Sequence, residues 1–350
     1  MLERLAAEQY DSIPGVPEPS ENPLLVGHPE EAGLLAGAYR AGRLHHAILL
    51  AGPLGIGKAT LAFRLAHHLL KYPKAADAPE TLEDADVSSS LFRQIASGSH
   101  PSILHLTRPF DDKRKVFRTL VTVEEIRRVN RFLSMTSHDG GYRVVIVDSA
   151  DDMNTNAANA LLKNLEEPPA RTIFLLISHS PGRLLPTIRS RCQTVRLKPL
   201  DGQSLRAVLQ TLETDLPSDR AELEALAARA EGSVRTAILL TQFGGLEIGG
   251  ALDRVLAADR FDLTEAARLS DAVSGRDQTI QFDIFNRMAL DAITEAAGGA
   301  AKAGEIERAG RLSDFWSEAN QRIVETGIYN LDRKQHAVGL LGRMHGLMRN

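Results

Sequence analysis

The stretch Gly52-Pro53-Leu54-Gly55-Ile56-Gly57-Lys58 has the glycine and lysine spacing of a phosphate-binding loop. Its glycines allow backbone N–H groups to close around phosphate oxygens, and Lys58 would reach the β- and γ-phosphates. The next residue should be Ser or Thr, whose hydroxyl holds Mg²⁺, but it is Ala59. Thr60 is a poor replacement, because one further residue along a helix turns the side chain by about 100°. The sequence therefore predicts a site that binds ATP or ADP weakly, with a weakened position for Mg²⁺.

A second motif supports the same site. The run Tyr142-Arg143-Val144-Val145-Ile146-Val147-Asp148 is a β-branched segment that ends in a carboxylate. This is the usual form of the strand whose Asp ligates Mg²⁺ through water in P-loop ATPases; a simple strand-end cap is the alternative role for Asp148. ATPases of the AAA+ type place a Glu next, as the base that polarises the attacking water, but here the next residue is Ser149. A serine hydroxyl is not a base near pH 7, so we expect hydrolysis to be weak or absent.

An open parallel sheet is the structure that would position these motifs. Apolar runs typical of buried strands alternate with amphipathic stretches, and this alternation predicts an α/β fold with helices on both faces of the sheet. Ligands of such sheets bind at the carboxyl ends of the strands, where the glycine loop lies. The predicted strands are 47–51, 103–107, 143–148, 172–177 and 193–197, and the predicted helices between them include 121–133 and 152–167.

The two ends of the chain have a different character. Residues 1–22 are polar and proline-containing, and are expected to form an extended arm that is mostly loop. Residues 203–242 predict three short helices, and the chain beyond residue 246 is helical to its end. Glycine pairs at 244–245 and 249–250 are expected to form a boundary, and Gly298-Gly299 and Gly304 are expected to interrupt the last helices.

Composition limits the classes of function. The 350 residues are 43% hydrophobic and 25% charged, with a formal net charge of −4, so any contact with DNA must come from a local patch. Cys192 is the only cysteine, which excludes an internal disulfide and a multi-cysteine zinc site. The sequence shows no signal peptide and no apolar run of membrane-spanning length, so a cytoplasmic protein without membrane contact is expected.

Three further blocks carry a resemblance to a known family. They are the helix-and-turn block from Asn159 to Pro169, whose end reads Leu165-Glu166-Glu167-Pro168-Pro169, the block Ser190-Arg191-Cys192, and Tyr329-Asn330-Leu331-Asp332-Arg333-Lys334 near the end. Together with the glycine loop, they resemble the clamp-loader subunits of bacterial DNA polymerase III, in particular the delta-prime family. The similarity is dense from about residue 22 to 200 and thinner beyond.

The resemblance implies a fold and a role. It implies an N-terminal arm (1–22), a RecA-like AAA+ nucleotide-binding domain with a parallel sheet (23–199), a small helical lid domain (200–245) and an all-α collar or oligomerisation domain (246–350). The implied role is a hydrolysis-poor member of a five-subunit ring that loads a sliding clamp during DNA replication. The implied partners are the gamma/tau and delta subunits, with the beta sliding clamp and primed DNA reached through the complex. The chain itself would have no polymerase active site.

The same resemblance implies roles for individual residues. Arg191 would project across a subunit interface and stabilise the charge on a neighbour's γ-phosphate, in trans; a structural arginine at a helix end is the alternative. Ser178 stands at the sensor-1 position and Arg235 at the sensor-2 position, where a plain surface arginine is nearly as well supported. Val26 lies where relatives contact adenine. Relatives also carry a four-cysteine zinc module, but residues 71–98 contain no cysteine, so no zinc is expected here.

Two other functions remain open from the sequence. One is a fully active ATPase of the gamma/tau type, against which Ala59, Ser149 and the absent zinc cysteines argue. The other is a small-molecule P-loop kinase or transferase, which would need an acceptor site and a lid rich in arginines. The long helical C-terminal third is more typical of an oligomerisation domain than of such an enzyme.

Overall fold

The structure, a computed structural model, describes residues 4–135, 141–212 and 220–349. Its centre is a sheet of five parallel strands in the order β2-β5-β6-β1-β7. The strands are β1 (Ala47–Ala51), β2 (Ile103–Leu106), β5 (Arg143–Asp148), β6 (Thr172–Ser178) and β7 (Gln193–Arg196). Each lies within one residue of its predicted bounds. This topology confirms the expected α/β fold with an open parallel sheet.

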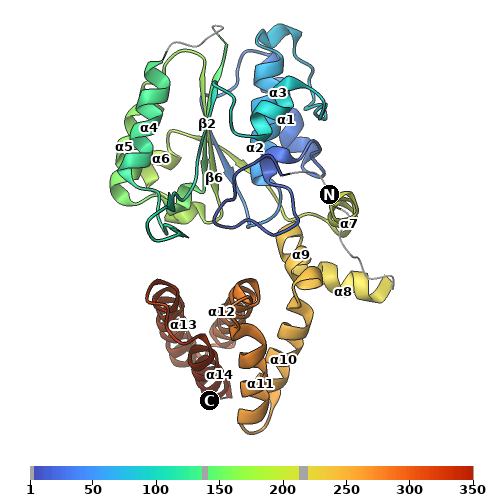
Figure 1. Ribbon diagram of the computed structural model, residues 1–350, viewed down its shortest axis with the longest axis vertical. Helices are drawn as coiled ribbons and strands as arrows, with labels where there is room; N and C mark the ends of the chain where they lie inside the picture. The colour runs from blue at the N-terminus through green and yellow to red at the C-terminus, as the bar shows by residue number, and fades with distance from the viewer. Residues whose placement is uncertain (1–3, 136–140, 213–219, 350) are drawn as a thin grey trace. The chain divides into compact units, whose positions relative to one another are not determined.

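Helices cover both faces of this sheet (Figure 1). One face carries α1 (Pro29–Arg40), α2 (Lys58–Lys71) and α3 (Ser90–Ala96), and the other carries α4 (Val123–Ser134), α5 (Thr155–Glu166) and α6 (Pro186–Arg189). Residues of β1 alternate between the two layers, because successive side chains of a strand point to opposite faces. Ile48 and Leu50 belong to the first hydrophobic cluster, whereas Ala47 and Leu49 belong to the second. The sheet is therefore buried on both sides.

Shorter elements lie between these helices and strands. A two-stranded hairpin, β3 (Phe110–Asp111) with β4 (Val116–Phe117), follows β2. The short 3₁₀ helices are η1 (Pro19–Glu21), η2 (Ala75–Asp77), η3 (Ala150–Asp152) and η4 (Pro181–Arg183).

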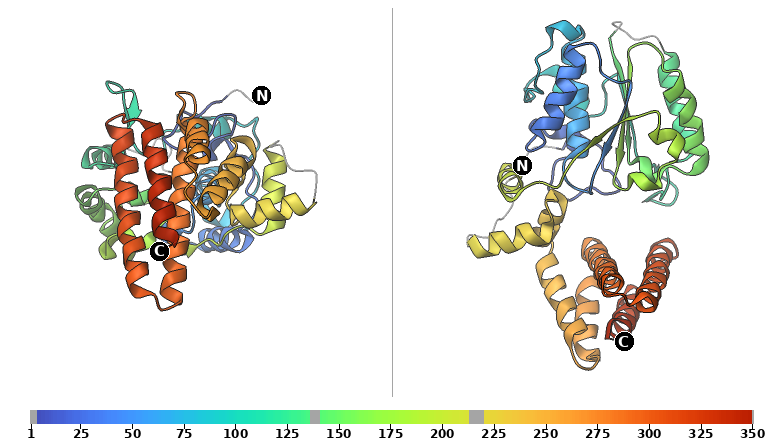
Figure 2. Two further views of the ribbon diagram at one scale, coloured as in Figure 1. Left: turned by 90° about the horizontal axis from the view of Figure 1, so that it is seen from below. Right: turned by 180° about the vertical axis from the view of Figure 1, so that it is seen from behind.

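The rest of the chain is helical. Three short helices follow the sheet, as predicted: α7 (Gly202–Thr211), α8 (Arg220–Ala230) and α9 (Val234–Gln242). Five more complete the chain: α10 (Gly245–Ala257), α11 (Leu263–Ser274), α12 (Thr279–Lys302), α13 (Ile306–Ile328) and α14 (Arg333–Arg349). The long pair α12 and α13 lies side by side (Figure 2, orange to red). The chain divides into two compact units, with the change between Thr236 and Ala237. The finer division at residues 199 and 245 stays a prediction.

Two predicted helix breaks are wrong. Helix α12 continues through Gly298-Gly299, and α10 continues through the glycine pair at 249–250. A glycine inside a helix costs about 1 kcal/mol relative to alanine, which the packing of a long helix against its neighbours can offset. Gly304, by contrast, adopts φ +81° between α12 and α13, and Gly244 adopts φ +73° before α10. These two glycines do end helices, because the left-handed conformation is one that other residues rarely adopt.

A buried histidine joins three helices of the C-terminal unit. His336 on α14 is 5% exposed, and its Nε2 lies 2.9 Å from Oδ1 of Asn286 on α12. Its Nδ1 lies 3.5 Å from the hydroxyl of Thr326 on α13. Burial lowers the pKa of His336 from 6.5 to about 4, with a smaller contribution from the Arg322 charge.

This pKa predicts acid sensitivity of the C-terminal unit. Between pH 6.5 and pH 4 the unfolded chain binds a proton that the folded chain does not, so stability falls as the pH falls through this window. We expect the free energy of unfolding to drop by up to about 1.4 kcal/mol per pH unit for this group. The sole tryptophan, Trp316, lies on α13 and reports unfolding of this unit in urea at pH 7, 6 and 5. In His336→Gln the dependence should be shallower; equal slopes for both proteins would contradict the assignment.

Candidate nucleotide site

The glycine loop connects β1 to α2, as the motif requires. Close packing against another segment of the chain fixes the conformation of the loop. The carbonyl of Gly55 accepts a hydrogen bond from the Val234 N–H at 2.9 Å. A Cβ on Gly55 would lie 2.4 Å from the Ser233 hydroxyl and 2.6 Å from Cβ of Arg235. With φ +78° as well, this position excludes other residues. The loop is therefore held against the segment that begins α9.

Lys58 is the first residue of α2 and is buried, at 3% exposure. Its Nζ donates a hydrogen bond to the carbonyl of Gly52 at 2.7 Å and another to the carbonyl of Pro53. Burial lowers the pKa of Lys58 to about 8, although the charges of Asp148 and Asp151 oppose this shift. The lysine is thus folded onto its own loop.

Asp148 ends β5 beside the glycine loop, and Ser149 follows it, almost fully buried. Burial raises the pKa of Asp148 to about 7, and the charge of Asp11 adds to the shift while Lys58 opposes it. A protonated carboxyl is a poor ligand for Mg²⁺. The structure therefore places the lysine and the carboxylate together, as the two motifs predicted.

Two acidic residues that the sequence analysis did not single out form hydrogen bonds at the same edge of the sheet. Asp151 accepts hydrogen bonds from the Ser178 hydroxyl at 2.7 Å and from the backbone N–H of His179 at 2.5 Å. Asp152 forms a bidentate pair with Arg108, at 2.8 Å to Nε and 2.6 Å to Nη2. The pair of acidic residues that follows the strand-end Asp148 after two intervening residues was the signal that could have identified them.

The remaining predicted residues fall on different parts of this edge. Ser178 ends β6 and is fully buried, with its hydroxyl directed to Asp151. Arg235 lies against the glycine loop, and its Nη1 donates to the backbone carbonyl of Asp11. Val26 is half-buried near His28, whose Nε2 lies 2.7 Å from the carbonyl of Ile56 in the loop. Ser178 and Arg235 therefore contact groups of this edge, and the roles of these residues and of Val26 in nucleotide binding stay predictions.

The positions after Lys58 lie on α2. Ala59 packs against the first hydrophobic cluster, and Thr60 is half-buried one residue further along the same helix. The expectation that Thr60 does not replace the missing hydroxyl stays a prediction.

Arg191 lies at the opposite edge of the sheet from the glycine loop. It follows α6 and precedes β7, whose first residue Gln193 pairs with Ile48 near the start of β1. Gly52, the first residue of the loop, lies four residues beyond Ile48, about 13 Å further along at the rise of a strand. The Nη2 atom of Arg191 lies 2.5 Å from Oε1 of Glu166, and its Nη1 donates to the carbonyl of Thr187 at 2.9 Å. The Arg191 side chain is 34% exposed, and its partner Glu166 is the last residue of α5.

Cys192 is half-buried beside Arg191, and burial raises the pKa of its thiol to about 11. It is therefore a protonated, unreactive side chain at pH 7. Within the described ranges, no group of three or more His, Cys, Asp or Glu residues is arranged to hold a metal ion. None of the helices described here is both long enough and apolar enough to cross a membrane.

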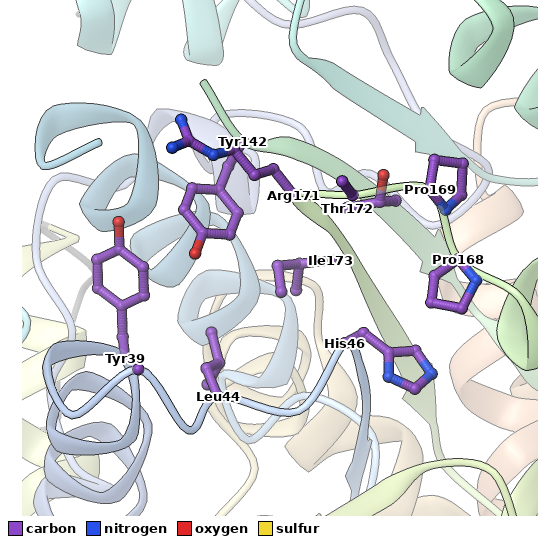
Figure 3. Close-up of a pocket in the computed structure, with 11 residues that line it drawn as sticks. Tyr39, Leu44, His46, Tyr142, Pro168, Pro169, Arg171, Thr172 and Ile173 are labelled. Atoms are coloured by element: carbon purple, nitrogen blue, oxygen red, sulfur yellow. The ribbon is translucent and has the colours of Figure 1, made fainter. Parts of the chain in front are cut away.

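A cavity of about 290 Å³ lies at the amino ends of the strands and is separate from this site (Figure 3). It is lined by residues that precede or begin β1, β5 and β6, among them His46, Tyr142 and Thr172, together with Tyr39 of α1. None of the residues predicted for nucleotide binding lines it. The cavity therefore adds nothing to the nucleotide site.

Comparison with known proteins identifies the family. A family model described as "DNA polymerase III, delta subunit" matches residues 27–201. The delta' subunit of Pseudomonas aeruginosa DNA polymerase III is 42% identical over 194 residues, which cover 55% of this chain and 54% of that protein. The delta' subunit of Bacillus subtilis is 34% identical over 195 residues, which cover 56% and 54%. The tau subunit of Escherichia coli is 31% identical over 219 residues, which cover 62% and 32%.

The chain spans about half the length of the delta' relatives that it matches. The matched region holds the sheet, the glycine loop and Arg191, whereas the helices beyond residue 201 lie outside the family model. Since the family model spans half of the 350 residues, the chain belongs to the delta-prime family of clamp-loader subunits of bacterial DNA polymerase III.

Proposed function

We propose that this chain is the delta-prime subunit of a DNA polymerase III clamp loader, in which it completes an AAA+ ring with gamma/tau and delta subunits. Through that complex it would act on the beta sliding clamp and on primed DNA, in the cytoplasm. We further propose that its own site binds ATP or ADP with little hydrolysis, and that Arg191 serves a neighbouring subunit in trans.

The position of Arg191 is the observation that carries this proposal. A partly exposed arginine at the edge of the sheet away from the glycine loop has no evident use at its own nucleotide site. A planar guanidinium supplied across an interface can stabilise the negative charge that spreads over the oxygens of a phosphoryl group in transfer. The ion pair with Glu166 is partly exposed on both sides, so releasing Arg191 costs only about 0–1 kcal/mol.

The composition of the site supports poor hydrolysis. Ala59 supplies no hydroxyl for Mg²⁺, and the buried Ser149 stands where an active ATPase has its base. Asp151 does not take over this role, because it already accepts hydrogen bonds from Ser178 and from the His179 N–H. The lysine and the glycines are nevertheless intact, which supports binding.

An active ATPase of the gamma/tau type is the second candidate. It is favoured by the similarity to the tau subunit of Escherichia coli and by the complete glycine loop with Lys58. The same Ala59 and Ser149 argue against it.

Turnover by the purified chain separates the two candidates. We expect steady-state phosphate release from ATP to be far below 1 s⁻¹, the low end of common enzyme rates. A matched gamma/tau subunit, assayed alone under the same conditions, provides the positive control. Turnover at about 1 s⁻¹ or faster would favour the motor ATPase. Co-purification with gamma/tau and delta subunits tests membership of the complex independently of turnover.

A further inference from the structure

Residues 4–21, which we name the N-terminal strap, form a closed loop rather than a free arm. The Arg4 guanidinium pairs with the carboxylate of Glu18, which is 7% exposed. The backbone N–H groups of Leu5 and Ala6 donate to Oε1 of Glu21 at 2.6 and 3.0 Å. In Figure 1 this dark blue segment loops past the lower edge of the sheet, where the strands end. The strap is thus fixed at the edge that carries the nucleotide site.

One anchor of the strap lies on the partly buried ion pair between Arg108, after β2, and Asp152, after β5. The ring of Tyr10 lies against the guanidinium of Arg108, 4.1 Å from ring centroid to Cζ. Arg108 is the residue that holds Asp152 with two hydrogen bonds. Beside this stack, the Thr107 hydroxyl donates to Oε1 of Gln9 at 2.6 Å. A cation and an aromatic face in partly buried surroundings attract each other by about 0.5–2 kcal/mol.

A second anchor lies on the glycine loop itself. Arg235 donates a hydrogen bond from Nη1 to the carbonyl of Asp11, and the same nitrogen lies 3.9 Å from the Asp11 carboxylate. Arg235 also packs against Gly55 of the loop. The negative charge of Asp11 is close enough to Asp148 to contribute to its raised pKa. Asp11 therefore places a negative charge among the groups that would face the phosphates of a nucleotide.

We propose that the N-terminal strap is an intramolecular occupant of the nucleotide site, and that ATP or ADP binds by displacing Tyr10 and Asp11. This inference rests on the proposed nucleotide site. The carboxylate of Asp11 and the phosphates of a nucleotide are both anions, and they compete for Arg235 at the glycine loop. The strap would then hold a large share of molecules in a form that does not bind nucleotide.

The size of the effect follows from the share of open molecules. The apparent Kd equals the intrinsic Kd divided by the fraction of molecules that can bind. If the strap is closed in about nine molecules of ten, its release tightens binding about ten-fold. Removing one of the two anchors should open the strap in only part of the molecules, so the apparent Kd for nucleotide should fall by about three- to five-fold.

The test measures the affinity of the full chain for MgATP and MgADP by calorimetry. Tyr10→Ala removes the contact with Arg108 without changing charge, so tighter binding reports displacement and not electrostatics. Tyr10→Phe is the matched control, because it keeps the ring on Arg108. Asp11→Asn removes the carboxylate, with Glu8→Gln as its control. Glu8 loses the same charge elsewhere on the strap, is 72% exposed, and its only described ion pair, with Arg4 at 3.6 Å, is of the exposed kind that contributes little to stability.

Hydrogen exchange supplies the second readout. The N–H groups of Leu5, Ala6 and Gln9 donate to side chains of the strap, the last to the Ser12 hydroxyl at 2.7 Å. Saturating nucleotide should speed their exchange in the unaltered chain, and Tyr10→Ala should speed it without nucleotide.

Three outcomes are possible. Tighter binding by Tyr10→Ala and Asp11→Asn, with both controls unchanged, supports the strap. Measurable binding with equal affinity in all five proteins overturns the strap and leaves the proposed nucleotide site in place. No binding by any of them at millimolar nucleotide overturns both.

Discussion

Replacing Arg191 with alanine is expected to cut ATP hydrolysis at the neighbouring site of a reconstituted clamp loader by about 10³-fold or more, the range known for arginines supplied in trans. Turnover summed over the complex should fall by less, because the other subunits keep their own arginines. The isolated chain should stay folded, since the partners of Arg191 are the partly exposed Glu166 and the carbonyl of Thr187. Clamp loading should slow along with hydrolysis.

Three variants sharpen this test. Arg191→Lys should restore activity only in part, because an ammonium lacks the planar fork of a guanidinium. Arg189→Ala removes an exposed arginine from α6, the short helix that precedes Arg191, and should leave turnover unchanged. Glu166→Gln frees Arg191 from its ion pair and should not lower turnover. Normal assembly with unchanged stimulated turnover in Arg191→Ala would reduce Arg191 to a structural residue.

Replacing Lys58 with methionine is expected to weaken the binding of ATP and ADP by at least about 100-fold. Charged hydrogen bonds from a buried ammonium to phosphate contribute about 1.5–3 kcal/mol each, and 2.7 kcal/mol corresponds to 100-fold. The fold should tolerate the change. Burial already lowers the pKa of Lys58 to about 8, so its burial as a cation costs energy, and methionine fills a similar volume.

Calorimetry at millimolar nucleotide, with a melting curve for each protein, checks this prediction. Lys71→Met is the matched control, because Lys71 ends the same helix and its side chain is 43% exposed. That variant should bind nucleotide as the unaltered chain does. Equal affinity in Lys58→Met would show that the loop does not bind nucleotide through its lysine.

The sheet could be predicted from sequence because its strands are buried on both faces. Such strands are continuous apolar runs, as in Ala47–Ala51 and Thr172–Ser178, and they end where polar residues begin. The glycine pairs in α10 and α12 misled the same reasoning, since glycine weakens a helix without ending it unless the backbone turns to positive φ.

The site was predictable only where its residues form a motif. Lys58 follows the recognisable glycine loop, and Asp148 ends a recognisable strand. A parallel sheet brings the carboxyl ends of its strands, and the loops that follow them, to one edge. The contacts of the strap could not be predicted from the sequence. Tyr10 and Arg108 are distant along the chain, and the prolines of the first 23 residues leave no periodic pattern from which a packed surface could be read. The expected loop is present, but sequence alone does not show what it covers.

The register between β7 and β1 places the glycine loop and Arg191 at opposite ends of the strands, so the subunit has two unlike edges. In the proposed function, nucleotide binds at one edge of the sheet and Arg191 serves a neighbour from the other, with the five residues of β1 between them. A contact between these two unlike edges would be heterologous, so such subunits would associate head to tail and not about a twofold axis. Each member of that assembly would contact the nucleotide of one neighbour and present its own nucleotide to the other. Nucleotide state would then be communicated around the assembly in a single rotational sense.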